Sequence, residues 1–155
     1  MAAPQRQIDH CPCGLPQPFD TCCGRYLGGT TAPTAEALMR SRYSAFTRQD
    51  EAYLLATWHP STRPASLDLH APPLPTWLGL KLIAHTVQDA SHATVEFIAR
   101  SKTNGRAQRL HEVSRFVRED GRWYYLNGET PPIPANTPAD SSPKPLRIPI
   151  KTHRL

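Results

Sequence analysis

All four cysteines of this 155-residue chain lie within thirteen consecutive residues near its N-terminus. They form two close pairs, Cys11/Cys13 and Cys22/Cys23, with eight residues between them. Thiolates that converge to about 3.8 Å from one another make the tetrahedral cage that zinc prefers, with Zn–S distances of about 2.3 Å. The sequence therefore predicts a metal site with zinc as the metal and four ligands: Cys11, Cys13, Cys22 and Cys23.

The residues between and beside the cysteines favour the bends that such a site needs. Both pairs are closer than the two-to-four-residue spacers of most zinc sites, so the backbone must turn sharply at each. Pro12 fixes one φ angle, while Gly14 and Gly24 permit conformations that other residues disfavour. We expect residues 14–21 to form a short loop or helical turn that brings the second pair onto the first.

Three other uses of the four cysteines stay open. A disulfide within either pair would be strained, which leaves only cross-pairings. The first ten residues lack the apolar segment of a secretory leader, so a reducing, cytoplasmic location without membrane association is expected. Four thiolates also suit an iron–sulfur cluster. A redox-active dithiol is disfavoured because the chain has no Cys-x-x-Cys motif.

The cysteine pattern resembles the SEC-C zinc motif, best known from the C-terminal tail of the SecA translocation ATPase, in which the four matching cysteines bind zinc. Further motifs across about residues 9–130 resemble the YchJ family of bacterial proteins: Leu38-Met39-Arg40-Ser41-Arg42-Tyr43-Ser44-Ala45-Phe46, Thr57-Trp58-His59-Pro60, Trp77-Leu78-Gly79-Leu80, Ser114-Arg115-Phe116 and Trp123-Tyr124-Tyr125. The resemblance implies a zinc knuckle followed by a nuclear transport factor 2-like (cystatin-like) α+β domain. It implies no particular activity.

One departure from the SEC-C pattern bears on the choice of partner. SEC-C motifs usually carry Ser-Gly-Lys-Lys directly after Cys-Pro-Cys-Gly, whereas this chain has Leu15-Pro16-Gln17-Pro18 there. The missing lysines argue against an anionic partner on the knuckle.

The chain is expected to divide into three parts: a knuckle at 1–30, the α+β domain at 31–129, and a tail at 130–155. Seven of the 17 prolines lie in the tail, which has no hydrophobic period, so we expect it to be disordered. The knuckle has no net charge, the domain has twelve basic and ten acidic residues, and the tail carries a net charge of +3. The tail has no Phe, Tyr or Trp with which to stack on nucleic-acid bases.

Helices are expected first and strands after them. Thr34 and Asp50 are typical N-cap residues, and each precedes apolar residues at three- and four-residue spacing. From Trp77 onward the period becomes that of strands, and the residues expected on one face of the first strand alternate with Lys81, Ile83 and His85: Leu80, Leu82, Ala84 and Thr86. Strong hairpin signals follow at Asn104-Gly105 and Asp120-Gly121. This order predicts an α+β fold with helices packed on one face of a bent, four-stranded antiparallel sheet.

The space between helices and sheet is where a ligand pocket is expected. Polar residues on elements that should face one another are candidates: Arg40, Arg42, Tyr43, His59, Glu112 and Arg115. A buried Glu112 would need Arg40 or Arg42 as a partner, because an unpaired internal charge is costly. Such a pair more often fixes a fold than catalyses a reaction, and the chain has no nucleophile or phosphate-binding motif. We therefore assign no catalytic residue.

Three functional hypotheses follow. The favoured one is a zinc-binding adaptor in which the knuckle binds a protein partner. Its zinc is structural, because four thiolates leave no open coordination position. The alternative is a small-molecule binder or enzyme that uses the pocket of the α+β domain. A third, weaker hypothesis is contact with nucleic acid or the ribosome through knuckle and tail, which salt would weaken.

Overall fold

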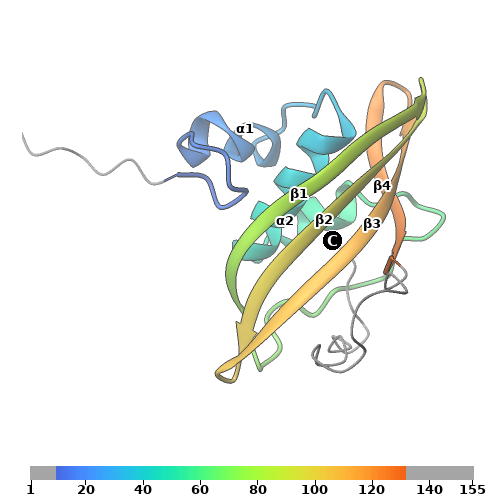
Figure 1. Cartoon of the computed structure of the whole chain (residues 1–155). Coiled ribbons are helices and arrows are strands. Elements are labelled where there is room, and N and C mark those ends of the chain that lie inside the picture. The colour runs from blue at the N-terminus through green and yellow to red at the C-terminus, as the bar shows by residue number, and fades with distance from the viewer. Residues whose placement is uncertain (1–9, 132–155) are drawn as a thin grey trace, which may run out of the picture.

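The computed structural model describes residues 10–131 (Figure 1). Short helical elements come first: η1 (Phe19–Thr21), α1 (Cys23–Leu27), α2 (Ala35–Thr47) and α3 (Glu51–Ala56). Four strands follow: β1 (Thr76–Asp89), β2 (His92–Thr103), β3 (Arg106–Glu119) and β4 (Arg122–Glu129). No helix of this part is long and apolar enough to cross a membrane. The disordered tail predicted for 130–155 falls outside the described residues from position 132 onward.

Both predicted helix starts are confirmed. Thr34 Oγ1 accepts a hydrogen bond from the amide of Ala37 at 3.0 Å. Asp50 Oδ1 accepts one from the amide of Tyr53 at 3.1 Å. Each bond satisfies an amide donor in the first turn, which has no partner within the helix itself. The caps therefore set where α2 and α3 begin.

The four strands form an antiparallel meander in the order β1-β2-β3-β4, as predicted. Asn104 and Asp120 adopt φ values of 52° and 51°, and the glycine after each has a φ of 77°. Two successive residues with positive φ are typical of the tight type I′ hairpin turn. The helices lie on one side of the bent sheet, with α2 running behind β1 and β2 in Figure 1.

Strand β1 departs from the simple alternation predicted for residues 80–86. Leu82 pairs with the buried Phe97 of β2. The register then shifts, so that His85 pairs with the buried Val95 and shares its side of the sheet. A bulge of this kind turns the residues after it to the opposite face and bends the strand. The prediction was wrong because the local sequence pattern does not indicate that β1 has an extra residue between Leu82 and Ala84.

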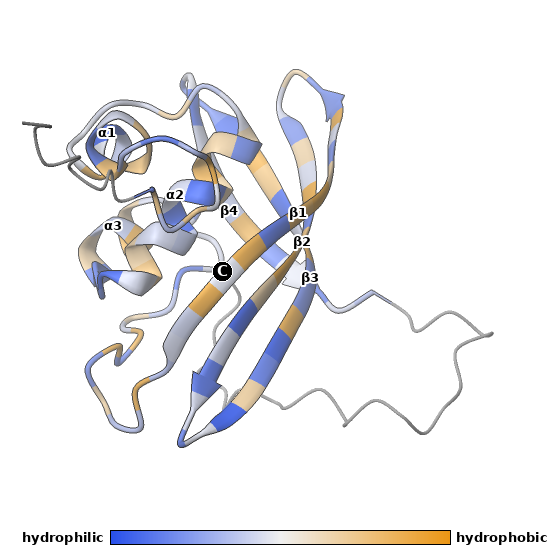
Figure 2. Cartoon of the chain, turned by 60° about the vertical axis from the view of Figure 1, so that its left-hand side comes forward, coloured by the Kyte–Doolittle hydropathy of each residue, from blue (hydrophilic) through white to orange (hydrophobic). Residues whose placement is uncertain are grey.

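The core fills the space between the helices and the inward face of the sheet. On β3, Glu112, Ser114 and Phe116 are at most 2% exposed, whereas Arg115 is exposed. The even-numbered residues of β3 therefore face the helices. Figure 2 shows hydrophobic and hydrophilic bands alternating along the strands, as expected for a sheet with one buried face. The largest fully buried hydrophobic side chains are Tyr43, Tyr125, Phe97, Phe116, Leu38, Met39, Leu54 and Leu67.

Candidate metal centre

The four cysteines come together at one point between α1, α2 and the start of β1. Their Sγ atoms all lie within 4.8 Å of one another. The cysteines are at most 3% exposed. The Sγ atoms of Cys13 and Cys22 are 3.6 Å apart, close to the edge of a tetrahedron around zinc, about 3.8 Å. All four cysteines belong to the described part of the chain, and no disulfide links them.

Two tight turns bring the cysteine pairs together. The amide of Cys11 donates to the carbonyl of Gln17 at 2.7 Å, which closes the loop between the pairs. Gly14 has a φ of 95°, a conformation that side chains disfavour. At Gly24 a Cβ atom would lie 2.8 Å from the carbonyl oxygen of Phe19. These glycines are therefore needed for the knuckle to close.

Apolar side chains cover the sulfurs, as a buried cluster of soft ligands requires. The cover comes from both parts of the chain: Leu15, Phe19, Leu27 and Leu80. Leu80 belongs to β1, so the sheet helps to exclude water from the cysteines. The knuckle thus shares an interface with the α+β domain.

One face of α2 holds the knuckle in place. Arg40 Nη1 donates to the carbonyl oxygen of Cys13 at 2.8 Å. The Ser44 hydroxyl lies 3.5 Å from Cys11 Sγ. The guanidinium of Arg48 lies 4.2 Å from the centre of the Phe19 ring. Residues four apart share a helix face, so Arg40, Ser44 and Arg48 make one polar stripe that faces the knuckle.

Electrostatics favour a cation among the sulfurs. The pKa of Cys13 is lowered, chiefly because its thiolate accepts a hydrogen bond from the thiol of Cys23, whose own pKa is raised by the same bond. Burial raises the pKa of Cys22 to about 12. A thiolate on one cysteine therefore disfavours ionisation of its neighbours, and several thiolates can coexist only around a cation. The donor set fits a closed, four-sulfur centre for a metal such as zinc.

The structure does not bring the six pocket candidates together at one site. Arg40 lies at the knuckle, as described above. Arg42 and Glu112 are in the core, 0% and 2% exposed. Tyr43 is buried at the edge of a surface cavity of about 490 Å³, which also has Pro12, Thr47 and residues 75–79 in its lining. Of the six, only Tyr43 lines that cavity.

Arg42 is held by groups of the protein itself. Its Nη1 donates to the carbonyl of Leu54 at 2.8 Å and to Thr57 Oγ1 at 2.6 Å. Its guanidinium carbon lies 5.2 Å and 4.6 Å from the ring centres of Trp58 and Tyr125. Burial lowers the pKa of Arg42 to about 10, so the side chain stays cationic at neutral pH.

Glu112 is the buried anion that accompanies this cation. Tyr125 and Tyr53 and, to a smaller extent, Glu112 raise the pKa of Arg42 and so offset part of the effect of burial. Ser114 Oγ donates to Glu112 Oε2 at 2.8 Å. Gly128 makes room for the carboxylate, because a Cβ atom there would collide with Glu112.

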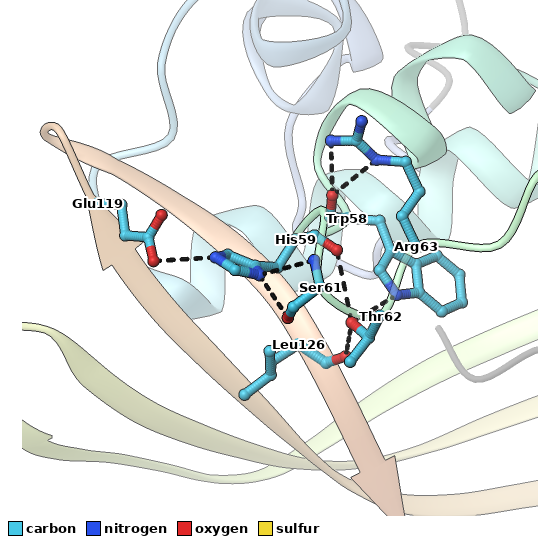
Figure 3. A network of polar contacts seen from close by, with 7 residues as sticks. All are labelled: Trp58, His59, Ser61, Thr62, Arg63, Glu119 and Leu126. Carbon is cyan, nitrogen blue, oxygen red and sulfur yellow. Dashed lines mark hydrogen bonds and ion pairs between the residues drawn. The ribbon is translucent and has the colours of Figure 1, made fainter.

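The last two candidates lie outside the core. The imidazole of His59 has two polar neighbours (Figure 3). Its Nε2 is 2.9 Å from Glu119 Oε1, and its Nδ1 is 2.7 Å from Ser61 Oγ. Arg115 lies on the outward face of β3 and donates to Glu129 at 2.7 Å. Both side chains thus have exposed polar partners.

Sequence reasoning missed Ser44 and Arg48 as neighbours of the knuckle, and it placed Arg40 in the pocket. A signal was present, because Arg40, Ser44 and Arg48 recur every four positions and so share one face of the helix. What the sequence alone could not supply was the element that this stripe would face.

A compact four-cysteine knuckle packed against helices on a bent antiparallel sheet defines the class of protein: a nuclear transport factor 2-like domain that carries a SEC-C-type motif. The family model described as "YchJ, middle NTF2-like domain" matches residues 34–128. Curated relatives agree. A UPF0225 protein of Bordetella parapertussis is 52% identical over 132 residues, which cover 83% of this chain and 98% of the relative. The chain belongs to the YchJ family.

Solved structures support the same assignment. A SEC-C motif containing protein from Rhodopseudomonas palustris has a TM-score of 0.73 and 35% identity, over 80% of this chain and 100% of its own. A second one, from Psychrobacter arcticus, has a TM-score of 0.65 and 33% identity, over 77% and 81% of the two chains. The likeness covers the SEC-C class as well as the fold, so the chain contains a metal-binding type of module.

Proposed function

We propose that this protein is a zinc-binding adaptor in which the metal is structural and the knuckle, fixed to the α+β domain, recognises a protein partner. The four buried sulfurs within 4.8 Å of one another carry the metal assignment. Four thiolates would occupy every position of tetrahedral zinc, so the metal would hold the fold and leave no position for a substrate. The four thiols need a reducing compartment, which favours the cytoplasm.

The recognition surface in this proposal is the junction of knuckle and sheet. The cavity of about 490 Å³ takes its lining from the knuckle (Pro12), from α2 and from the start of β1. Leu78, in that lining, is 56% exposed, and the nearby Leu74 is 49% exposed. Exposed apolar side chains around a hollow are typical of protein interaction sites. A partner that docks there would contact both the knuckle and the α+β domain.

The small-molecule alternative has less support. The lining of the cavity includes Tyr43 and Thr47 but no carboxylate, imidazole, ammonium or guanidinium group that could orient a polar substrate or move a proton. The buried Arg42 donates to protein groups through Nη1 and does not line this cavity. A catalytic role would therefore need a site other than this cavity.

Capture experiments with three variants test the adaptor proposal. The intact protein is used as bait in a lysate of its source, and each captured partner is then purified and its affinity is measured directly. Cys22→Ser/Cys23→Ser removes two metal ligands, and Leu78→Asp places a charge in the junction. Val87→Asp is the matched control, since Val87 is also on β1 and is 61% exposed.

The proposal expects a partner whose affinity falls at least about tenfold with either the cysteine variant or Leu78→Asp, a loss of about 1.4 kcal/mol. The same partner should bind the Val87→Asp control as it binds the intact protein. Equal binding by all four proteins would contradict the proposal, and so would a partner whose binding is lost only in the control.

A further inference from the structure

The outward face of the sheet carries a group of cations near the β2–β3 hairpin. Lys81, Arg100, Lys102 and Arg109, named here the basic face, are all exposed. Arg100 pairs with Arg109, and Lys81 pairs with Ile98, so the four side chains share the side opposite the core. Neighbouring strands are about 4.8 Å apart and alternate residues about 7 Å, which sets the spacing of these charges. Figure 2 shows hydrophilic colour along β2 and β3 towards this hairpin.

The charges of the basic face are not neutralised within the described residues. The stretch from 98 to 110 contains four basic residues and no acidic one. Farther along the same face the pattern changes, because His111 pairs with Glu96 at 2.7 Å and Arg115 with Glu129 at 2.7 Å. Between residues 10 and 131, no carboxylate lies within ion-pair distance of any member of the basic face. Positive charge is therefore concentrated at one end of the sheet.

The register makes this arrangement costly for folding. Arg100 and Arg109 are directly opposite each other on β2 and β3, and like charges in that position destabilise a sheet. On its other side Arg100 pairs with Gly79, and nothing lies within 4 Å of the position a Cβ atom would take there. A pair of opposed arginines beside an open space suits an anion that bridges them.

We propose that the basic face binds the phosphate backbone of double-stranded RNA. Arginine forks suit phosphate oxygens, and the spacing of the cations over three strands would engage several phosphates at once. The basic face has no aromatic side chain for stacking on unpaired bases, which disfavours single strands. It has no helix that could enter the major groove of DNA, whereas the wide, shallow minor groove of A-form RNA is recognised largely by shape and backbone.

This binding surface is separate from the knuckle. The SEC-C lysines absent after Cys13 left the knuckle without an anion-binding signal, and the basic face supplies cations elsewhere in the fold. Its four members are distributed over β1, β2 and β3, with no run of basic residues in the sequence. RNA binding by the basic face and partner binding by the knuckle therefore depend on different residues, and each can be tested without the other.

Fluorescence anisotropy with the full chain and a labelled RNA duplex of about 16 base pairs tests the proposal over a range of salt concentrations. The test variant is Arg100→Gln/Arg109→Gln. The control, Arg118→Gln/Arg122→Gln, removes the same charge from exposed positions at the opposite end of β3 and β4. Duplex DNA of the same sequence and vesicles that contain an anionic phospholipid serve as competitors. Thermal unfolding of every variant reports on folding.

The intact protein is expected to bind the RNA duplex with an affinity that falls steeply with salt. The test variant should lose at least about tenfold in affinity and reduce the salt slope by about two, while the control loses about twofold or less. The test variant should unfold at the same or a higher temperature, because a repulsive pair is gone. No binding at low salt, equal losses in both variants, or tighter binding to DNA or vesicles than to RNA would overturn the proposal.

Discussion

The knuckle and the core of the sheet domain both bury ionisable groups, and they do so in opposite ways. In the core, the cation of Arg42 has a backbone carbonyl, a hydroxyl, two aromatic rings and the charge of Glu112 around it. In the knuckle, four potential anions face one another with no cation among their own side chains. The core supplies its own counter-charge, whereas the knuckle requires one from outside.

This difference separates a fold-fixing cluster from a binding site more clearly than burial does. Both clusters are almost completely buried, and both contain groups whose pKa values are displaced. Burial alone would mark both as functional candidates. What distinguishes them is the balance of charge within each.

Removal of the metal is expected to have the largest effect. Structural zinc contributes about 10–16 kcal/mol to the folding of zinc-finger peptides, so the knuckle should open when a chelator removes the metal. Hydrogen exchange followed by mass spectrometry should show lost protection over 10–27 and retained protection over β2 and β3. Unchanged protection in the knuckle would contradict the account, and lost protection in both regions would show that the two clusters are not independent.

Substitution Arg42→Met should come next. It leaves Glu112 buried without its cation, which typically costs about 3–5 kcal/mol in the free energy of unfolding. Urea denaturation measures this loss. The double variant Arg42→Met/Glu112→Leu should recover much of it, because apolar replacement of a whole buried pair is often close to neutral. Arg122→Met, at an exposed position on β4 away from the knuckle and the core, is the control and should cost about 1 kcal/mol or less.

Ser44→Ala should weaken metal binding without unfolding the domain. The Ser44 hydroxyl lies 3.5 Å from Cys11 Sγ, and groups that hydrogen-bond to ligands typically change metal affinity by about 10–100-fold. Competition with a coloured chelator measures the affinity of the variant against that of the intact protein. Ser66→Ala, at an exposed serine far along the chain, should change nothing. Equal affinities for Ser44→Ala and the intact protein would remove Ser44 from the metal centre.

The smallest effect is expected at the surface. Glu119→Gln removes the negative charge from the contact with His59, in which the Glu119 side chain is 53% exposed. Exposed ion pairs are worth about 0–1 kcal/mol, so thermal unfolding should shift little. A loss as large as that of Arg42→Met would mean that the His59 network does more than cap a loop.

Much of the fold could be predicted because its signals are local. Thr34 and Asp50 cap helices through hydrogen bonds to amides three residues later in the sequence. Asn-Gly and Asp-Gly favour tight hairpin turns through their own backbone conformations. The metal site could also be predicted from the sequence, because the close spacing of the four cysteines brings their sulfurs together. The bulge in β1 was not predictable, because pairing with β2 sets it and the sequence of β1 alone does not.

The surroundings of the site were harder to predict for the same reason. Arg40 and Arg42 are two positions apart on one helix, yet one reaches the knuckle and the other the core. Helical geometry separates them by about 200°, but only the folded chain says which element lies on each side. The basic face likewise exists only after three strands are paired.

The metal content of the purified protein tests the central claim most directly. Protein made in metal-limited medium and then supplied with zinc should hold one equivalent of zinc per chain by elemental analysis. The Cys22→Ser/Cys23→Ser variant, prepared identically, should hold almost none. Well under one equivalent in the intact protein, iron in place of zinc, or full zinc content in the variant would contradict the assignment of the quartet as a structural zinc site.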